Sequence, residues 1–257
     1  MVESGGGTLP PPPPGDATMA LFIDVDGTLV DFAERPDAVQ IDPQLREGLH
    51  ALRARLEGAL APLSGRPLHE IDALTGSHEG AAAGLHGAEI RRADGTIECV
   101  ATDRAQVQRL HEHAAAGLAD ATGVLVEAKP NGVALHWRRA PEQAARVRAV
   151  AAGLAREAGA GFMQQPGNHV IEIKPAGIDK GAAVRALMRS APFAGRRPWV
   201  LGDDLTDEHA FEAANAQGGV SVVVGARRPT AAMHALENPA AARAWLVALS
   251  RTPVLRA

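Results

Sequence analysis

Short apolar runs alternate with helix-like patterns over most of this chain. Residues 42–57 carry a helical period, with Asp42 as the N-cap and Pro43 in the first turn, and one apolar stripe consists of Leu45, Leu49, Leu52 and Leu56. The same patterns predict strands at 20–23, 59–63, 81–85, 199–201 and 220–224, helices at 68–74, 180–189 and 207–216, and a last helix that begins at Asn238. Such alternation predicts a parallel sheet covered on both faces, with ligands at the carboxyl ends of its strands.

Residues 90–174 interrupt this alternation. They read as a strand at 95–101, a helix at 103–118, strands at 123–129 and 132–138 around the turn signal Pro130-Asn131, a helix at 141–158, and a second hairpin of 161–165 and 168–174 across Pro166-Gly167. This pattern predicts an antiparallel sheet with helices on one face. We interpret it as an inserted α+β cap, so that 19–89 and 175–257 form the core.

Composition limits the class of protein. Of 257 residues, 46% are hydrophobic and 22% charged, a balance that can bury a core. The net charge of −4 and the lack of a long Lys/Arg run argue against nucleic acid and anionic membranes as partners. No apolar run reaches the roughly 20 residues that span a bilayer, and the basic-then-apolar order of a signal peptide is absent. We therefore expect a cytoplasmic, soluble protein, and a monomer.

Neither the cysteine content nor the N-terminal segment predicts catalytic chemistry. Cys99 is the only cysteine, so neither an intrachain disulfide nor a thiolate metal cluster can form. Residues 1–18 contain a glycine run and five consecutive prolines, which predict a disordered or polyproline-like tail. A ligand for a proline-recognition domain is the functional alternative, and Met19 could serve as a second start.

The strongest chemical signal directly follows the strand at 20–23. Asp24 and Asp26 lie two residues apart at its end, and Gly27 permits a tight turn. Two carboxylates so close together are costly to desolvate unless a cation or a proton lies between them. A hard cation such as Mg²⁺ would fit, whereas a solvated acidic turn is the alternative.

Three further strand or helix ends carry matching groups. Asp203, Asp204 and Asp207 follow the strand at 199–201, and would meet the first pair at one edge of a parallel sheet. Ser64, with Gly65 and Arg66, precedes a helix, where a hydroxyl and backbone N–H groups can bind phosphate. Lys180 begins another helix. Taken singly, Ser64 could be a plain helix cap and Lys180 a surface lysine.

Together, Asp24–Leu29, Ser64, Lys180 and the Gly202–Glu208 stretch resemble the four motifs of haloacid-dehalogenase-like phosphatases. The resemblance implies an α/β fold with a Rossmann-like parallel-sheet hydrolase core. It implies Asp24 as the nucleophile that forms an aspartyl-phosphate and Asp26 as general acid and base. Ser64 and Lys180 would contact the transferring phosphoryl. Mg²⁺ would be held by Asp24, the Asp26 carbonyl and Asp203, and the part played by Asp204 and Asp207 stays open.

The inserted segment carries charges on one face of each strand. By the period of two, Glu127 shares a face with Lys129, His136 with Arg138, and Glu172 with Lys174. A solvated face is one interpretation. The other is a polar lid whose carboxylates and cations bind sugar hydroxyls and phosphate.

Several stretches are similar to trehalose-6-phosphate phosphatases: 84–89 (GLHGAE), 127–129, 134–138, 170–175 and 201–208. The similarity runs from about residue 20 to 250 and implies hydrolysis of trehalose 6-phosphate to trehalose and phosphate. It implies substrate contacts at Gly65, Arg66, His86, Glu127, Lys129, Arg138, Glu172 and Lys174. For His86, a structural role is equally open. The alternatives are a phosphatase of another sugar phosphate (sucrose phosphate, a mannosyl phosphoglycerate or a hexose phosphate), a phosphomutase, or a non-catalytic sugar-phosphate sensor.

Overall fold

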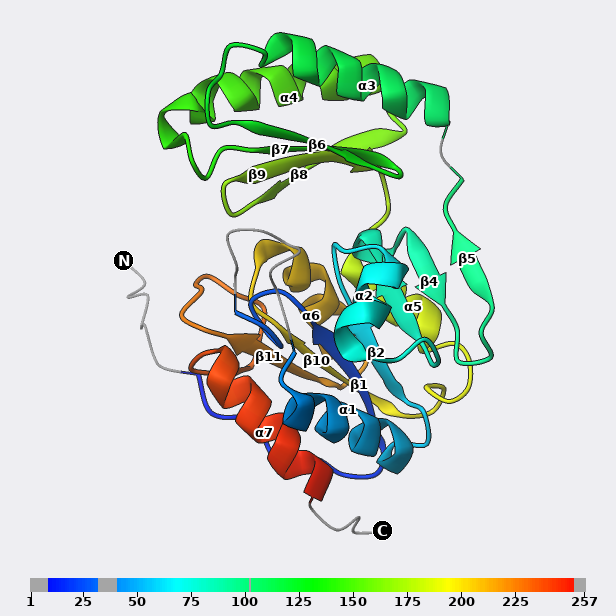
Figure 1. Cartoon of the computed structure of the whole chain (residues 1–257). Coiled ribbons are helices and arrows are strands. Elements are labelled where there is room, and N and C mark those ends of the chain that lie inside the picture. Colours follow the sequence, from blue (N-terminus) through cyan, green and yellow to red (C-terminus); the bar gives the residue numbers. More distant parts are fainter. Residues whose placement is uncertain (1–8, 32–40, 102, 252–257) are drawn as a thin grey trace. The chain divides into compact units, whose positions relative to one another are not determined.

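The computed structural model describes residues 9–31, 41–101 and 103–251 (Figure 1). The chain forms two compact units. One unit extends to Cys99 and resumes at Asp179, and the other comprises Val100–Ile178. The second unit is therefore an insertion between two halves of the first.

The first unit is built on an eight-stranded sheet in the order β12-β11-β10-β1-β2-β3-β4-β5. The neighbouring strands from β12 to β3 pair in parallel, whereas β3, β4 and β5 pair antiparallel. The strands are β1 (Met19–Asp24), β2 (Leu60–Leu63), β3 (Ala82–Gly84), β4 (Glu89–Arg91), β5 (Ile97–Cys99), β10 (Arg197–Gly202), β11 (Val220–Val224) and β12 (His234–Leu236). The parallel-sheet α/β core expected from the alternation is confirmed.

Helices cover both faces of this sheet. Helices α1 (Pro43–Arg55) and α7 (Pro239–Arg251) pack side by side, and α5 (Lys180–Leu187) packs on α6 (Glu208–Asn215) behind the strands (Figure 1). Helix α2 (Leu68–Thr75) follows β2. Strands β1, β2 and β11 are buried along their whole length, as expected for strands enclosed between two helical layers.

The second unit is a four-stranded antiparallel sheet in the order β6-β7-β9-β8. Its strands are β6 (Leu125–Lys129), β7 (Gly132–His136), β8 (Phe162–Gly167) and β9 (Val170–Pro175), and its helices are α3 (Arg104–Gly117) and α4 (Ala144–Ala158). Val133, Leu135, Ile171 and Ile173 pack with both helices in one apolar cluster. The inserted segment thus has its own core.

The boundary of the insertion differs from the one expected at residue 90. Residues 89–99 form β4 and β5, which extend the core sheet, so that the chain leaves this sheet only after Cys99. A buried ion pair ties β4 to α2: the Arg91 guanidinium donates to both carboxylate oxygens of Asp72 at 2.7 and 2.8 Å. An antiparallel hairpin at the end of a parallel sheet breaks the alternation from which the boundary was inferred.

The second hairpin of the insertion also turns at a different place. The expected turn at Pro166-Gly167 lies within β8, and the chain turns at Asn168 and His169, the latter with a left-handed φ of 60°. Strand β8 is an edge strand, where a proline lacking an N–H is tolerated. In an edge strand, proline therefore predicts a turn less reliably than in a central strand.

The proline-rich segment contacts the core from Leu9 onward, whereas residues 1–8 of the expected tail lie outside the described residues. The Leu9 side chain packs against the main core, and the Pro10 carbonyl accepts a hydrogen bond from the Ala235 N–H at 2.9 Å. The Ala17 carbonyl accepts one from Arg196 at 2.8 Å. The segment 9–18 therefore contacts the core at β12 and at the start of β10, and it is not a free tail. None of the described helices has the length and apolar character to cross a membrane.

Candidate active site

The carboxyl ends of three neighbouring strands bring the candidate catalytic groups together. Asp24 is the last residue of β1, Ser64 follows β2, and Asp203 follows β10. Since β1 lies between β2 and β10 in parallel register, with Asp24 opposite Leu63, these ends coincide. This is the edge at which parallel sheets bind ligands, as the sequence analysis expected.

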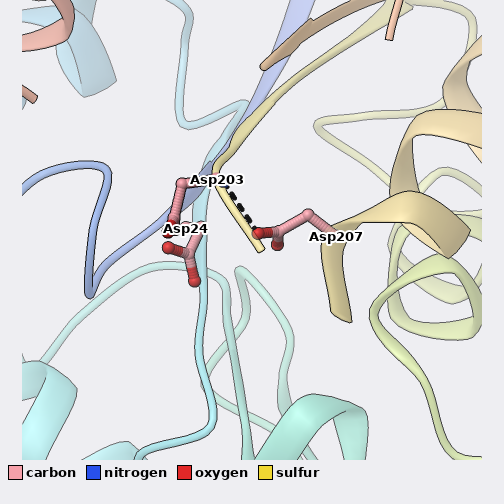
Figure 2. Close-up of side chains that lie close together, drawn as sticks. All are labelled: Asp24, Asp203 and Asp207. Carbon is pink, nitrogen blue, oxygen red and sulfur yellow. Dashed lines mark hydrogen bonds between the residues drawn. The ribbon is translucent and has the colours of Figure 1, made fainter. Parts of the chain in front are cut away.

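Asp24, Asp203 and Asp207 form an acidic cluster there, with one oxygen of each within 4.8 Å of the others. Figure 2 shows the carboxylates of Asp24 and Asp203 close together, with Asp207 approaching from the start of α6. Burial raises the pKa of Asp24 well above its usual range, and the attraction of Lys180 does not cancel this effect. Burial and the neighbouring Asp207 carboxylate raise the pKa of Asp203 to about 7. Such raised values mark a site that favours a cation or a proton.

Gly27 lets two of these elements approach closely. Its φ of +91° lies in the left-handed region, and a Cβ at this position would lie 2.3 Å from Oδ2 of Asp203. The next residue, Thr28, donates its hydroxyl to Oδ1 of Asp203 at 3.4 Å. The loop after β1 therefore depends on glycine to bring Asp203 beside Asp24.

Lys180 neutralises part of the cluster. Its Nζ donates to Oδ1 of Asp24 at 2.5 Å and to Oδ1 of Asp207 at 2.6 Å, and the residue is 3% exposed. Burial disfavours the ammonium, but the attraction of the two carboxylates is stronger, so the pKa of Lys180 lies above its ordinary value. Lys180 is therefore a buried cation, and the reading of it as a surface lysine is wrong.

The hydrogen bonds assign different roles to the three aspartates that follow β10. Oδ2 of Asp207 accepts the N–H groups of Asp203 and Asp204, each at 3.0 Å, while its Oδ1 accepts from Lys180. Asp204 completes a capping box, because its side chain accepts the backbone N–H of Asp207. Both carboxyl oxygens of Asp207 are thus engaged in orienting the turn and Lys180.

Asp24 and Asp203 remain as the carboxylates that can face a metal. Oδ2 of Asp24 is buried and has no hydrogen-bond partner among the described residues. A buried carboxylate oxygen without a donor, beside a second carboxylate, is the donor set of a hard cation such as Mg²⁺. The residues present therefore fit the metal that the sequence motifs imply.

Ser64 and Arg66 lie beside this cluster in the loop between β2 and α2. Ser64 is 1% exposed, and its Oγ accepts the N–H of Arg66 at 3.1 Å, which leaves the hydroxyl proton available for another acceptor. The Arg66 guanidinium donates to both carboxylate oxygens of Asp26, each at 2.7 Å, and also contacts Glu70. Arg66, which we expected at the substrate, thus holds the expected general acid and base.

Gly65 and His86 lie against each other. A Cβ at Gly65 would lie 2.7 Å from Nε2 of His86. The structure therefore places His86 next to the loop of Ser64, within the core unit. A direct contact of Gly65 or His86 with substrate stays a prediction.

The charged residues of the inserted unit share one face of its sheet. Glu127, Ala134 and Glu172 lie opposite one another across β6, β7 and β9, and Lys174 lies two residues along from Glu172. Glu127 pairs with Lys129 at 2.6 Å and with His136 at 2.8 Å. This face lies opposite the apolar face covered by α3 and α4, so the expected alternation is confirmed. Whether these residues contact a sugar stays a prediction.

Arg138 departs from the expected strand. Strand β7 ends at His136, and Arg138 lies in the turn that follows it. Its expected place on the charged face therefore does not follow from strand alternation.

Sequence reasoning missed three supporting residues. Thr28 contacts Asp203, Glu70 contacts Arg66, and one carboxylate oxygen of Glu89 accepts the N–H of Leu68 at 2.9 Å, at the start of α2. Of these, Glu70 had a local signal, since it lies four residues after Arg66, in the first turn of α2. The other two contacts join segments distant in sequence.

Comparisons with known proteins agree with this site. The family model described as trehalose-phosphatase matches residues 22–240. A probable trehalose-phosphate phosphatase of Sinorhizobium fredii is 40% identical over 90% of this chain and 87% of its own length. The trehalose-6-phosphate phosphatase of Escherichia coli K12 is 39% identical over 81% of this chain and 78% of its own. Among solved structures, the C-terminal domain of the Candida albicans trehalose-6-phosphate phosphatase aligns with a TM-score of 0.80 at 20% identity, covering 91% of this chain and 92% of that one.

Proposed function

Because the chain belongs to the trehalose-phosphatase family, we propose that it is a phosphoric monoester hydrolase that converts trehalose 6-phosphate and water to trehalose and inorganic phosphate. The observation that carries this proposal is that Asp24 and Asp203, at the ends of neighbouring strands, lie close together and that the buried ammonium of Lys180, at the start of α5, donates to Asp24. A nucleophile, a metal-binding carboxylate and a cation in one place are what phosphoryl transfer requires.

Asp24, Asp203 and the backbone carbonyl of Asp26 would hold Mg²⁺. When bound, Mg²⁺ neutralises the charge of the phosphoryl oxygens and of the two carboxylates. Lys180 supports the same charge balance from the protein side, since it already contacts Asp24. Asp207 and Asp204 orient the turn that carries Asp203.

The reaction proceeds in two displacements. In the first, a carboxylate oxygen of Asp24 attacks phosphorus, the bond from phosphorus to the sugar oxygen breaks, and Asp26 donates a proton to that oxygen. In the second, Asp26 takes a proton from water, the water oxygen attacks phosphorus, and the Asp24 carboxylate is released. Covalent catalysis of this kind divides one difficult step into two easier ones. The Ser64 hydroxyl and the Lys180 ammonium bind the phosphoryl oxygens in both steps.

The charged face of the inserted sheet supplies the groups for the sugar. Glu127 and Glu172 are acceptors for sugar hydroxyl protons, whereas Lys129 and Lys174 on the same face, and Arg138 from the turn after β7, are donors to sugar oxygens or phosphate. Trehalose 6-phosphate has many hydroxyls and one dianionic group, so a surface that mixes both charges suits it.

The experiment is phosphate release from a panel of sugar phosphates, with Mg²⁺ and with EDTA. We expect EDTA-sensitive release that is fastest with trehalose 6-phosphate and absent in the Asp24→Asn variant. If hexose phosphates and sucrose phosphate were hydrolysed as fast as trehalose 6-phosphate, the proposed substrate would be refuted, whereas the proposed phosphatase mechanism would stand. Full activity in EDTA, or in Asp24→Asn, would refute the mechanism.

A further inference from the structure

Three consecutive residues beside the Ser64 loop have a left-handed backbone. Their φ angles are 48° at Leu85, 57° at His86 and 103° at Gly87. A residue other than glycine is strained in this conformation, so two in succession persist only where surrounding contacts enforce them. The contacts of residues 84–89, here called the brace segment, show what enforces this turn.

On one side, the brace segment holds the Ser64 loop. The His86 N–H donates to the Ser64 carbonyl at 2.8 Å, and the Leu85 N–H donates to the Arg66 carbonyl at 2.9 Å. The left-handed turn directs both N–H groups to the loop. The imidazole of His86 lies against Gly65 between these two bonds. Ser64, Gly65 and Arg66 therefore each have a contact with Leu85 or His86.

The same segment also fixes the end of this loop. One carboxylate oxygen of Glu89 accepts the N–H of Leu68, the first residue of α2. Gly84 lies so close to the loop that a Cβ would be 2.9 Å from the Arg66 carbonyl oxygen and from the Leu68 nitrogen. The brace segment thus contacts the loop from its first residue to the helix that follows.

On the other side, the brace segment contacts the start of α5. A Cβ on Gly87 would lie 2.9 Å from the Asp179 carbonyl oxygen and 3.2 Å from Cβ of Ala183. Lys180 directly follows Asp179, whose side chain caps the same helix by accepting the Ala182 N–H. The brace segment thus contacts both the Ser64 loop and the start of the helix that carries Lys180.

We propose that the brace segment sets the position of Ser64 relative to Lys180, and that His86 is a positioning residue that acts through Gly65 instead of contacting the sugar. The inference rests on the proposed phosphatase function, in which these two groups bind the phosphoryl oxygens. Phosphoryl transfer depends mainly on positioning, and an error of about 1 Å can cost about 100-fold in rate.

The test compares His86→Ala and His86→Asn with the same changes at His169. His169 is the matched control, because it is also a histidine with left-handed φ (60°) but lies in the turn after β8, outside the core unit. Kinetic constants are measured with trehalose 6-phosphate and with p-nitrophenyl phosphate, which has no sugar. Asparagine tolerates the left-handed region, so it keeps the backbone conformation while it removes the imidazole.

We expect His86→Ala to lower kcat about 30-fold or more on both esters, with KM changed less than about threefold. His86→Asn recovers part of this loss, and the His169 variants stay within about twofold of the unmodified protein. Gly87→Ala places a methyl group against Asp179 and not against Gly65, and we expect it to lower kcat on both esters as well. This variant replaces His86→Ala in the test if His86→Ala does not fold.

Two results would overturn the inference. A loss confined to KM for trehalose 6-phosphate would make His86 a sugar contact, and a lower melting temperature with unchanged kcat would make its role purely structural. If the unmodified protein hydrolyses only p-nitrophenyl phosphate, the proposed substrate is refuted, but the kcat values of the His86 and His169 variants on this ester still test the inference. If it hydrolyses neither ester, calorimetric binding of inorganic phosphate decides: affinity about tenfold weaker in His86→Ala supports the inference, and equal affinity refutes it.

Discussion

Replacing Asp203 with asparagine should stabilise the metal-free protein at alkaline pH while it abolishes magnesium binding. Asp203 is held beside Asp24 and Asp207, and its pKa of about 7 lies well above the ordinary value of 3.8. A raised carboxyl pKa means that the stability contributed by Asp203 is fully present below about pH 4 and is lost as pH rises through 7. Asparagine has nearly the same size and no charge, so the variant does not undergo this loss.

The size of the effect follows from the two pKa values. The difference between 3.8 and about 7 is about 3 pH units, and at about 1.36 kcal/mol per unit this gives up to about 4 kcal/mol. In EDTA, the stability of Asp203→Asn relative to the unmodified protein should therefore grow between pH 4 and 7 and level off above pH 8. Mg²⁺ at about 1,000 times its Kd should offset this difference at pH 8, since a ligand at that concentration adds about 4.1 kcal/mol to the stability of the protein that binds it.

The assay is urea unfolding followed by tryptophan fluorescence. The chain has three tryptophans, and a Trp137→Phe background removes the one in the inserted unit. Trp199 and Trp245, which stack in the core with ring centroids 6.0 Å apart, then report on the core alone. The reasoning would be refuted if Asp203→Asn were no more stable than its background at pH 8 in EDTA, or if Mg²⁺ stabilised both equally.

Two further changes test the buried charges and the proline-rich segment. Lys180→Met should destabilise the core by about 3–5 kcal/mol in urea at pH 8, because it leaves Asp24 and Asp207 buried without their cation; a loss below about 1 kcal/mol would contradict the role of this ion pair. Removal of residues 1–17 should cost about 2 kcal/mol with kcat and KM unchanged, because it removes the packing of Leu9 and the backbone contact of Pro10 with Ala235; an unchanged melting temperature would show that these contacts carry no stability.

The sequence predicts elements well where the signal is local. Helix α1 begins at Pro43 after the Asp42 cap, whose side chain accepts the Gln44 N–H, and β11 has the expected bounds of 220–224. A cap and a run of apolar residues are properties of neighbouring positions, so they can be read without knowledge of the fold. The Asp24 and Asp203 pair could be inferred for a related reason, since carboxyl ends of parallel strands meet at one edge.

Other features depend on contacts between distant segments. Nothing local distinguishes Asp203 from Asp207; the difference arises because Lys180 and two backbone N–H groups occupy both oxygens of Asp207. The left-handed turn at Leu85 and His86 follows from carbonyl groups of the Ser64 loop, which lie about 20 residues earlier. The proline run reads as solvated because its backbone lacks N–H groups, although one of its carbonyls pairs with the sheet edge.

The central claim is that Asp24 carries the phosphoryl group. The most direct measurement mixes the protein with trehalose 6-phosphate and Mg²⁺, quenches the reaction in acid over a series of short times, and reduces any acyl phosphate with borohydride. Peptide mass spectrometry then locates the reduced residue. The account predicts homoserine at position 24, dependent on both substrate and Mg²⁺ and absent in Asp24→Asn. Reduction at Asp26 or another carboxylate, or phosphate release with no reduced residue at any time, would contradict it.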